Sequence, residues 1–131
     1  SDELLSHCGK PPRWAVCLPP SAVSADGFLS QCHALICPNH TVNENWPRVG
    51  LEAMSAGVPL IVDNRGGWRE QAGSAAIYCN TPADYTNAVV QLASCENHRQ
   101  AMIEAGRDRI NRVADPCKIA QQWADLISAL R

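Results

Sequence analysis

A proline and a glycine bracket the segment that most constrains the fold of this chain. Pro47 suits the first position of a helix, because its missing N–H would have no partner there, and Gly57 suits the position just after a helix end. The sequence therefore predicts a helix over residues 47–56. Val58 to Val62 follow as a continuous apolar run rich in β-branched residues, which is typical of a strand covered on both faces.

The rest of the chain continues this alternation of strands and helices. Strands are expected at Trp14–Leu18, Ala34–Cys37, Val58–Val62 and Ala75–Cys79. Helices are expected at about 24–31, at 47–56, after the N-cap Thr81, at about 96–112, and after the cap Asp115-Pro116. This order predicts a Rossmann-like, three-layer α/β/α fold with a small parallel sheet of about four strands. Ligands are expected at the carboxyl ends of the strands.

The start of the 47–56 helix is expected to bind an anion. The first N–H groups of a helix have no partner within it and form the positive end of its dipole, so they attract phosphate. Glu44 precedes this helix start, and Glu52 lies further along the same helix. An anion site between two carboxylates suits a nucleotide diphosphate with a sugar on each side.

Composition indicates one packed domain with no polyanionic partner. The chain has 131 residues, of which 46% are hydrophobic and 18% charged, so residues 1–131 are expected to form a single domain. A net charge of −2 without a cluster of basic residues argues against nucleic acid as a partner. No apolar run approaches the roughly 20 residues that span a bilayer, and no signal-peptide pattern opens the chain.

The cysteines favour a reducing compartment. All seven are scattered without a C-x-x-C pair, and several fall in apolar runs, so we interpret them as buried thiols in the cytoplasm. Cys32, His33, Cys37 and His40 lie close in sequence but lack the spacing of a zinc module. We therefore expect neither a metal nor a cofactor.

The residues around the 47–56 helix resemble a known family. Glu44 and Glu52, with seven residues between them, are followed by Ala-Met-Ser-Ala-Gly-Val-Pro at 53–59, by Gly66-Gly67 and by Glu70. This pattern is similar to the signature of the retaining glycosyltransferases of family 4, within the glycosyl transferases group 1, which have the two-domain GT-B fold. The similarity is densest over residues 34–72.

The resemblance implies a donor-binding function. It covers only the later part of the family's C-terminal domain, because one or two β-α units expected before Trp14 and the N-terminal acceptor domain have no counterpart in the sequence. Lys10 and Arg13 do not match the basic pair that the family places near the diphosphate. The implied reaction transfers a hexose from a nucleotide diphosphate sugar to an acceptor with retention of configuration, and the isolated chain is expected to have little or no activity.

Roles for both glutamates follow from the resemblance. Glu52 corresponds to the residue that accepts hydrogen bonds from the ribose hydroxyls, a task that suits an acceptor-only carboxylate. Its alternative is a solvated helix glutamate in an i,i+4 pair. Glu44 corresponds to the catalytic residue beside the donor sugar, where it stabilises developing oxocarbenium charge. Its alternative is a loop carboxylate attracted by the helix dipole.

Further contacts to the donor are expected from the neighbouring loops. The backbone of residues 45–49 faces the diphosphate in the family, and the donor-binding set is Asn45, Trp46, Arg48, Val49, Gly66 and Gly67. Arg48 adds charge or is solvated, and Trp46 forms a wall of the sugar pocket or packs in the core. The glycine pair permits either close approach to a ligand or a plain turn.

Other functions remain open at this stage. The chain is alternatively a non-catalytic nucleotide-binding or protein-interaction module, which pairs with a partner domain or with itself through an exposed sheet edge. An epimerase or phosphorylase relative is a weaker alternative, because neither an acid–base set nor a pyridoxal-phosphate lysine environment is recognisable. Many relatives act on membrane lipids, so a peripheral position at the inner membrane face is compatible with the cytoplasmic prediction.

Overall fold

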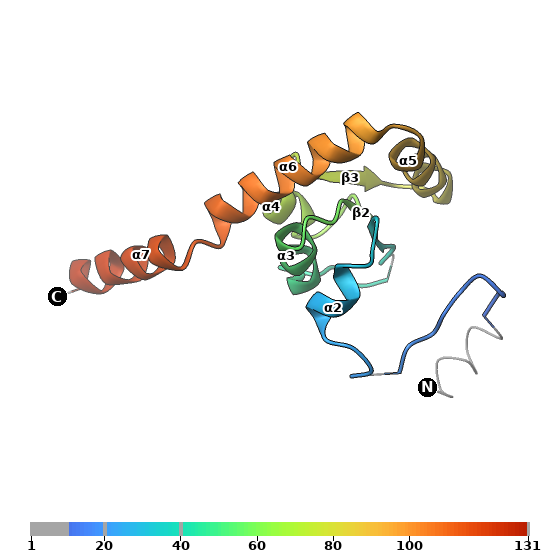
Figure 1. Cartoon of the computed structure of the whole chain (residues 1–131). Helices are drawn as coiled ribbons and strands as arrows, with labels where there is room; N and C mark the ends of the chain where they lie inside the picture. Colours follow the sequence, from blue (N-terminus) through green and yellow to red (C-terminus); the bar gives the residue numbers. More distant parts are fainter. Residues whose placement is uncertain (1–10, 20, 40, 131) are drawn as a thin grey trace.

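A parallel sheet lies at the centre of the fold. The computed structural model describes residues 11–19, 21–39 and 41–130. Within them the sheet has three strands in the order β1-β2-β3, namely β1 (Leu35–Cys37), β2 (Leu60–Asp63) and β3 (Ala76–Cys79) (Figure 1). Leu35 is in register with Leu60, and Leu60 with Ala76, so the strands begin at one edge of the sheet and end at the other. The predicted α/β class with a small parallel sheet is confirmed.

Helices surround the sheet. The described helices are α2 (Ala25–Leu29), α3 (Arg48–Ser55), α4 (Trp68–Ala72), α5 (Pro82–Ser94), α6 (Glu96–Val113) and α7 (Pro116–Ala129). The connection from β1 to β2 contains α3, and that from β2 to β3 contains α4. The last three helices follow β3 in sequence, and α7 extends from the end of α6 away from the sheet (Figure 1).

The two faces of β2 bury separate apolar clusters. Leu60 and Val62 face the cluster that includes α3, α4 and part of α6, whereas Ile61 faces the cluster built with α5. These three side chains are completely buried. A strand covered on both faces explains why its sequence is continuously apolar rather than alternating.

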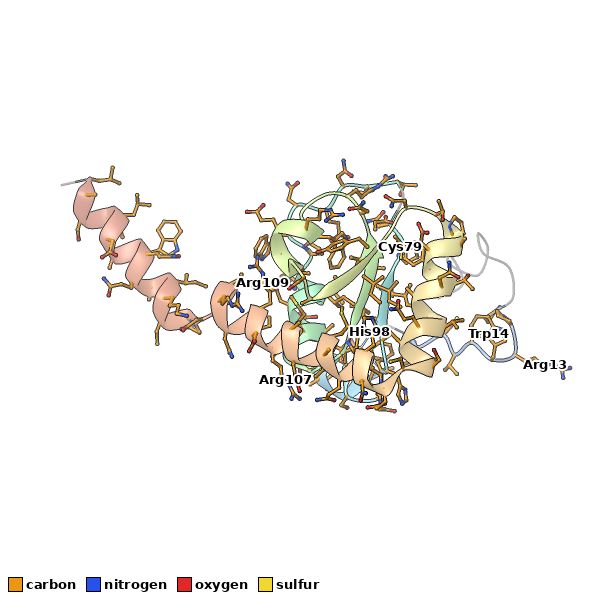
Figure 2. All side chains as sticks on the ribbon, turned by 90° about the horizontal axis from the view of Figure 1, so that it is seen from above. Arg13, Trp14, Cys79, His98, Arg107 and Arg109 are labelled. Atoms are coloured by element: carbon orange, nitrogen blue, oxygen red, sulfur yellow. The ribbon has the colours of Figure 1, made fainter. Side chains whose placement is uncertain are left out.

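Helix α6 packs against both α3 and α4 on one face of the sheet. A Cβ at Gly106 would lie 3.4 Å from Cγ of Met54, so α6 and α3 pack at close range here. Arg109 reaches the carboxyl end of α4, where its Nε donates to the carbonyl oxygen of Gln71 at 2.8 Å and its Nη2 donates to that of Glu70. Figure 2 shows Arg109 projecting from α6 toward the body of the molecule. A cation at the end of a helix satisfies carbonyl groups that have no partner within the helix.

The strand predicted over Trp14–Leu18 is wrong. This segment begins in a turn, in which the N–H of Ala15 donates to the carbonyl oxygen of Pro12 at 2.9 Å. It pairs with no described strand. Trp14 is 86% exposed, and Figure 2 shows it at the outside of the molecule. A short apolar run between prolines reads as a strand in sequence, but a strand requires a neighbour that supplies backbone partners. The described sheet therefore has three strands rather than about four.

The other predicted elements form with small shifts, and one helix was not predicted. Pro47 is the N-cap of α3 rather than its first residue, and β2 begins at Leu60. Helix α4 was assigned to no element, because its five residues are too few for a visible helical period. It buries Trp68, Gln71 and Ala72, which have the i, i+3, i+4 spacing of one helix face.

Helix α7 carries an apolar stripe that covers nothing in the described part of the chain. Every described residue of α7 is exposed. Trp123 is 61% exposed and Leu130 is 79% exposed. Asp115 caps the helix by accepting from the N–H groups of Cys117 and Lys118, so the helix start is fixed locally. The stripe is therefore an apolar surface of the molecule.

Helix α5 provides a test of the capping geometry. Asp84 accepts from the N–H groups of Asn80 and Thr81, and these hydrogen bonds hold the pKa of its carboxyl below the ordinary value of 3.8. A carboxyl with a lowered pKa in the folded state stabilises the fold above its unfolded pKa, and this contribution disappears as the pH falls. Asp84→Asn is therefore expected to lower the thermal midpoint at pH 7, with a difference from wild type that shrinks below about pH 4. Thermal unfolding followed by circular dichroism between pH 7 and pH 3 measures it.

Asp108→Asn is the matched control, because Asp108 is exposed on α6 and its side chain forms no hydrogen bond with another described residue. A constant difference between wild type and Asp84→Asn across this pH range would contradict the capping interpretation.

Candidate functional site

The loops that follow the three strands meet at one edge of the sheet. Residues 38–47, apart from residue 40, connect β1 to the start of α3, and residues 64–67 connect β2 to the start of α4. Both helices thus begin near the carboxyl edge of a parallel sheet, which is the usual position of ligand sites in such folds.

The glycine pair brings the first two loops into direct contact. The N–H of Gly67 donates to the carbonyl oxygen of Glu44 at 2.8 Å. A Cβ at Gly67 would lie 1.6 Å from the carbonyl oxygen of Asn45, and one at Gly66 would lie 2.5 Å from that of Glu44. Gly66 also has a φ of +59°, which favours glycine. The chain's own backbone therefore requires both glycines, whether or not a ligand approaches them.

Glu44 is exposed and lies beside the end of β1. Its Oε1 accepts from Nδ2 of Asn39 at 3.4 Å, and Oδ1 of Asn39 accepts in turn from the N–H of Val42 at 3.2 Å. The pKa of the half-buried Cys37 thiol, at the end of β1, is raised by burial and then by the charges of Glu44 and Asp63. Both carboxylates thus lie within electrostatic reach of the same strand end.

Helix α3 begins without a side-chain cap, and residues of α4 contact its start on the buried side. Pro47 is its N-cap and makes no capping hydrogen bond from a side chain. The carbonyl oxygen of Pro47 accepts from the N–H of Gly50 at 3.0 Å and from Nε2 of the fully buried Gln71 at 2.9 Å. A Cβ at Gly50 would lie 2.6 Å from the ring of Trp68, so the two helices are in close contact. Arg48 and Val49 are exposed at the helix start, and Trp46, just before the cap, is 41% exposed.

Glu52 lies on the outer face of α3. The opposite face, with Gly50, Ala53 and Met54, is buried. Arg48 precedes Glu52 by four residues and shares its exposed face. Neither side chain forms a hydrogen bond or an ion pair with another described residue. The i,i+4 pair that was the alternative interpretation of Glu52 is therefore not formed within the described part of the chain.

A buried pair at the same edge was not predicted. Asp63, the last residue of the central strand, is 1% exposed, and its Oδ1 accepts from the hydroxyl of Tyr85 on α5. The pKa of the Tyr85 phenol is raised by burial, by this hydrogen bond and by the charge of Asp63. Neither residue stands out in the sequence, because Tyr85 lies within the helix expected after Thr81 and Asp63 lies just beyond the strand expected at Val58–Val62. An acidic residue directly after a fully buried strand was the available signal.

The structure thus brings together some of the predicted site residues. Glu44, Asn45, Gly66 and Gly67 lie in mutual contact, and the other four predicted residues, Trp46, Arg48, Val49 and Glu52, lie just before or on α3. Lys10 and His40 lie outside the described residues. Arg13 extends outward from the N-terminal segment (Figure 2). Among the described residues, no three His, Cys, Asp or Glu side chains are placed to hold a metal ion.

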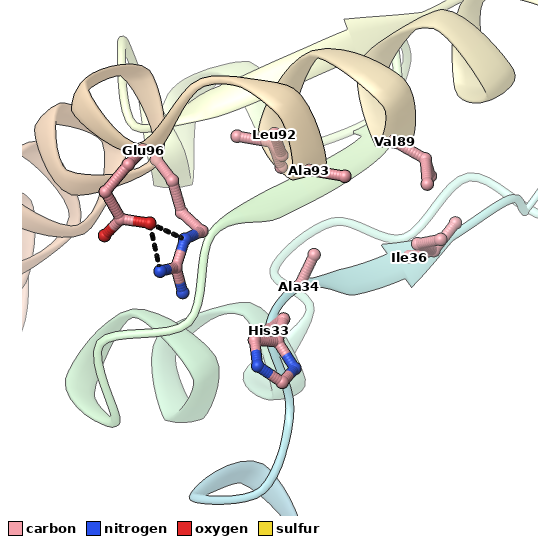
Figure 3. Close-up of a pocket in the computed structure, with 8 residues that line it drawn as sticks. His33, Ala34, Ile36, Val89, Leu92, Ala93 and Glu96 are labelled. Carbon is pink, nitrogen blue, oxygen red and sulfur yellow. Dashed lines mark hydrogen bonds and ion pairs between the residues drawn. The ribbon is translucent and has the colours of Figure 1, made fainter.

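Two pockets lie outside the predicted site. The larger, of about 380 Å³, is an apolar groove between β1 and α5 and is lined by His33, Ala34, Ile36, Val89, Leu92, Ala93, Glu96 and Arg99 (Figure 3). Ile36 is 44% exposed in it, and Glu96 and Arg99 form an ion pair there. The smaller, of about 270 Å³, lies between β3 and α5 and is lined largely by polar residues that include Asn80, Asp84 and Asn87.

Comparison with known proteins identifies the family. The family model described as Glycosyl transferases group 1 matches residues 21–109, and the chain belongs to this family. No curated protein and no solved structure matches the chain significantly. The matched region runs from just before α2 to near the end of α6, so it contains the whole sheet and the loops at its carboxyl edge.

Family membership assigns a glycosyltransferase-type function at the level of the family, and with it a sugar donor and an acceptor. In the described part of the chain, no helix has both the length and the hydrophobicity needed to cross a membrane.

The glycine contact generates a prediction. In Gly67→Ala the new Cβ would overlap the carbonyl group of Asn45, so residues 44–45 must move or the 66–67 turn must open. We expect a loss of about 3 kcal/mol in the free energy of unfolding, at the upper end for an overpacked site. Urea unfolding followed by tryptophan fluorescence measures it.

Gly106→Ala is the control, because its Cβ would meet no atom closer than 3.4 Å, which is an ordinary contact. It is expected to change the free energy of unfolding by no more than about 1 kcal/mol. Equal effects of the two substitutions would contradict a specific role for the close approach at Gly67.

Proposed function

We propose that this chain is the donor-binding part of a retaining glycosyltransferase of family 4. In this proposal, residues 1–131 are one partial nucleotide-sugar-binding domain of the GT-B type, which acts in the cytoplasm. The reaction transfers a hexose from a nucleotide diphosphate sugar to an acceptor, and a second domain binds the acceptor. Support comes from family membership and from the contact that holds Glu44, in the loop before α3, against the turn of Gly66 and Gly67.

The diphosphate lies at the amino end of α3 in this proposal. The N–H groups of the first helical turn have no partners within a helix, and the dipole favours an anion there. Asn45, Trp46, Arg48 and Val49 belong to this helix start and the loop before it, and Gly66 and Gly67 lie against the same loop. Arg48 is exposed, and it adds a positive charge to the site without an ion pair to another described residue.

The two glutamates hold opposite ends of the donor. Glu52, on the outer face of α3, accepts hydrogen bonds from two adjacent ribose hydroxyls. Glu44, at the edge of the sheet, accepts from hydroxyls of the hexose and stabilises the positive charge that develops at the anomeric carbon. Since acceptor groups are assigned to another domain, the isolated chain is expected to bind donor but to transfer sugar poorly or not at all.

Titration of the chain with a nucleoside diphosphate and with its hexose conjugate tests this function. Isothermal calorimetry is expected to show saturable binding at about 1 mM or tighter. Glu52→Gln should weaken both ligands about tenfold or more, because it removes a charged acceptor. Glu44→Gln should weaken the sugar conjugate more than the nucleoside diphosphate.

Glu104→Gln is the matched control, because Glu104 is exposed on α6, far along the chain from the site, and its side chain forms no hydrogen bond with another described residue. Wild-type binding that is insensitive to Glu52→Gln, or no saturable binding at millimolar concentration, would refute the proposal.

A second function, as a protein-interaction module, is favoured by two exposed apolar surfaces. The outer edge of β1 has no partner strand among the described residues and adjoins the groove that contains Ile36. The stripe on α7, with Trp123 at its centre, is also uncovered. A partner domain or a second copy of the chain fits these surfaces. Concentration-dependent self-association in sedimentation experiments, together with absent nucleotide binding, would favour this function over the first.

A further inference from the structure

The buried pair of Asp63 and Tyr85 connects helix α5 to the centre of the sheet. Tyr85 is 9% exposed, and its hydroxyl donates to Oδ1 of Asp63, which is almost fully buried. Burial of a carboxylate is unfavourable unless polar partners surround it, so a buried acidic side chain at a strand end requires an explanation. Apolar packing of α5 would be served equally well by phenylalanine at position 85 and a small apolar residue at position 63.

The residues after Asp63 are held from several sides. The N–H of Asn64 donates to the carbonyl of Cys79 at 2.9 Å, which extends the pairing of β2 with β3 by one step. Nδ2 of Asn64 donates to Oδ1 of Asn80 at 3.1 Å, and Oδ1 of Asn64 accepts from Nε of Arg69 at 2.6 Å. The loop from β2 to α4 therefore leaves the sheet from a fixed point.

That loop in turn fixes the loop that carries Glu44. Gly67 follows Asp63 after three intervening residues, and its N–H donates to the carbonyl of Glu44. The position of Gly66 leaves no room for a Cβ beside the same carbonyl. A displacement of the β2 end is thus passed to Glu44 through backbone atoms, with no flexible side chain between them.

We propose that Asp63 and Tyr85 are positioning residues for Glu44, which set the backbone from which Glu44 reaches the donor sugar. Neither side chain touches the donor in this proposal, which rests on the function proposed above. Their hydrogen bond fixes the position of the carboxyl end of β2, and this end sets the position of the 66–67 turn. This turn then sets the position of the loop that carries Glu44. The ribose end of the donor, held by Glu52 on α3, depends on this pair much less, because α3 is anchored through Gln71 and α6.

Tyr85→Phe tests the proposal with two independent measurements. Amide exchange of Gly67, followed by NMR, is expected to accelerate at least about tenfold, because the hydrogen bond to Glu44 opens more often. Affinity for the hexose conjugate of a nucleoside diphosphate should fall about tenfold, the size expected for one hydrogen bond to a charged group, while affinity for the nucleoside diphosphate stays within about twofold. A role in stability alone would weaken both ligands equally.

Tyr78→Phe is the matched control, because it removes a partly buried hydroxyl whose shorter hydrogen bond, at 2.7 Å, goes to the carbonyl of Gly73 and whose longer one, at 3.3 Å, goes to that of Trp68. It keeps the ring on which the guanidinium of Arg69 lies. Gly67 exchange in this variant should match wild type. Should Tyr85→Phe not fold, Asp63→Asn replaces it and is expected to change both measurements in the same direction but less, since the amide oxygen still accepts from Tyr85.

Unchanged Gly67 exchange in Tyr85→Phe would overturn the proposal, as would an equal loss of affinity for both ligands. Failure of wild type to bind either ligand would refute the proposed donor function instead, and the Gly67 exchange would still decide whether the Asp63–Tyr85 pair holds the loop.

Discussion

The backbone contact between residues 44–45 and residues 66–67 determines how the carboxyl edge of the sheet is organised. It joins loops that follow neighbouring strands, and it leaves no space for a side chain on either glycine. Such a contact is rigid, because hydrogen-bonded backbone replaces adaptable side chains on both sides. The catalytic role proposed for Glu44 and the positioning role proposed for Asp63 both follow from this one approach of two chain segments.

Specific hydrogen bonds also fix the buried side of α3 and α4. Gln71 occupies a fully buried position between α4 and α3, where its amide group satisfies the carbonyl of Pro47. Arg109 then satisfies the last carbonyls of α4 from α6. The carbonyl of Pro47 before α3 and the last carbonyls of α4 are thus paired within the protein. In consequence, the outer face of α3 presents Arg48 and Glu52 to solvent from a helix whose inner face is fixed.

The sequence predicted the regular elements well where local signals were strong. The Pro47–Gly57 bracket, the Thr81 cap and the Asp115 cap each mark a helix that forms, and the apolar runs before Cys37, Asp63 and Cys79 become strands. Prediction failed where tertiary structure determines the secondary structure. Trp14–Leu18 has the composition of a strand, but no neighbouring strand pairs with it in the described part of the chain. Helix α4 is too short for a helical period to be visible in its sequence. For the site, the family resemblance assigned Glu44, Gly66 and Gly67 to one donor site, which stays a prediction, and the structure has these three residues in contact. The Asp63–Tyr85 hydrogen bond joins residues 22 apart in sequence, so no local pattern reveals it.

Strand order in this sheet is the same as chain order, and this has a consequence for folding kinetics. Each strand pairs with the one that precedes it, after a single intervening helix, so the closing loops are short and their entropy loss is modest. In a sheet where a later strand inserts between two earlier ones, strand pairing is complete only after segments distant in sequence have met. Here the sheet is able to grow in one direction as the polypeptide leaves the ribosome, with α6 packing onto the finished layer last.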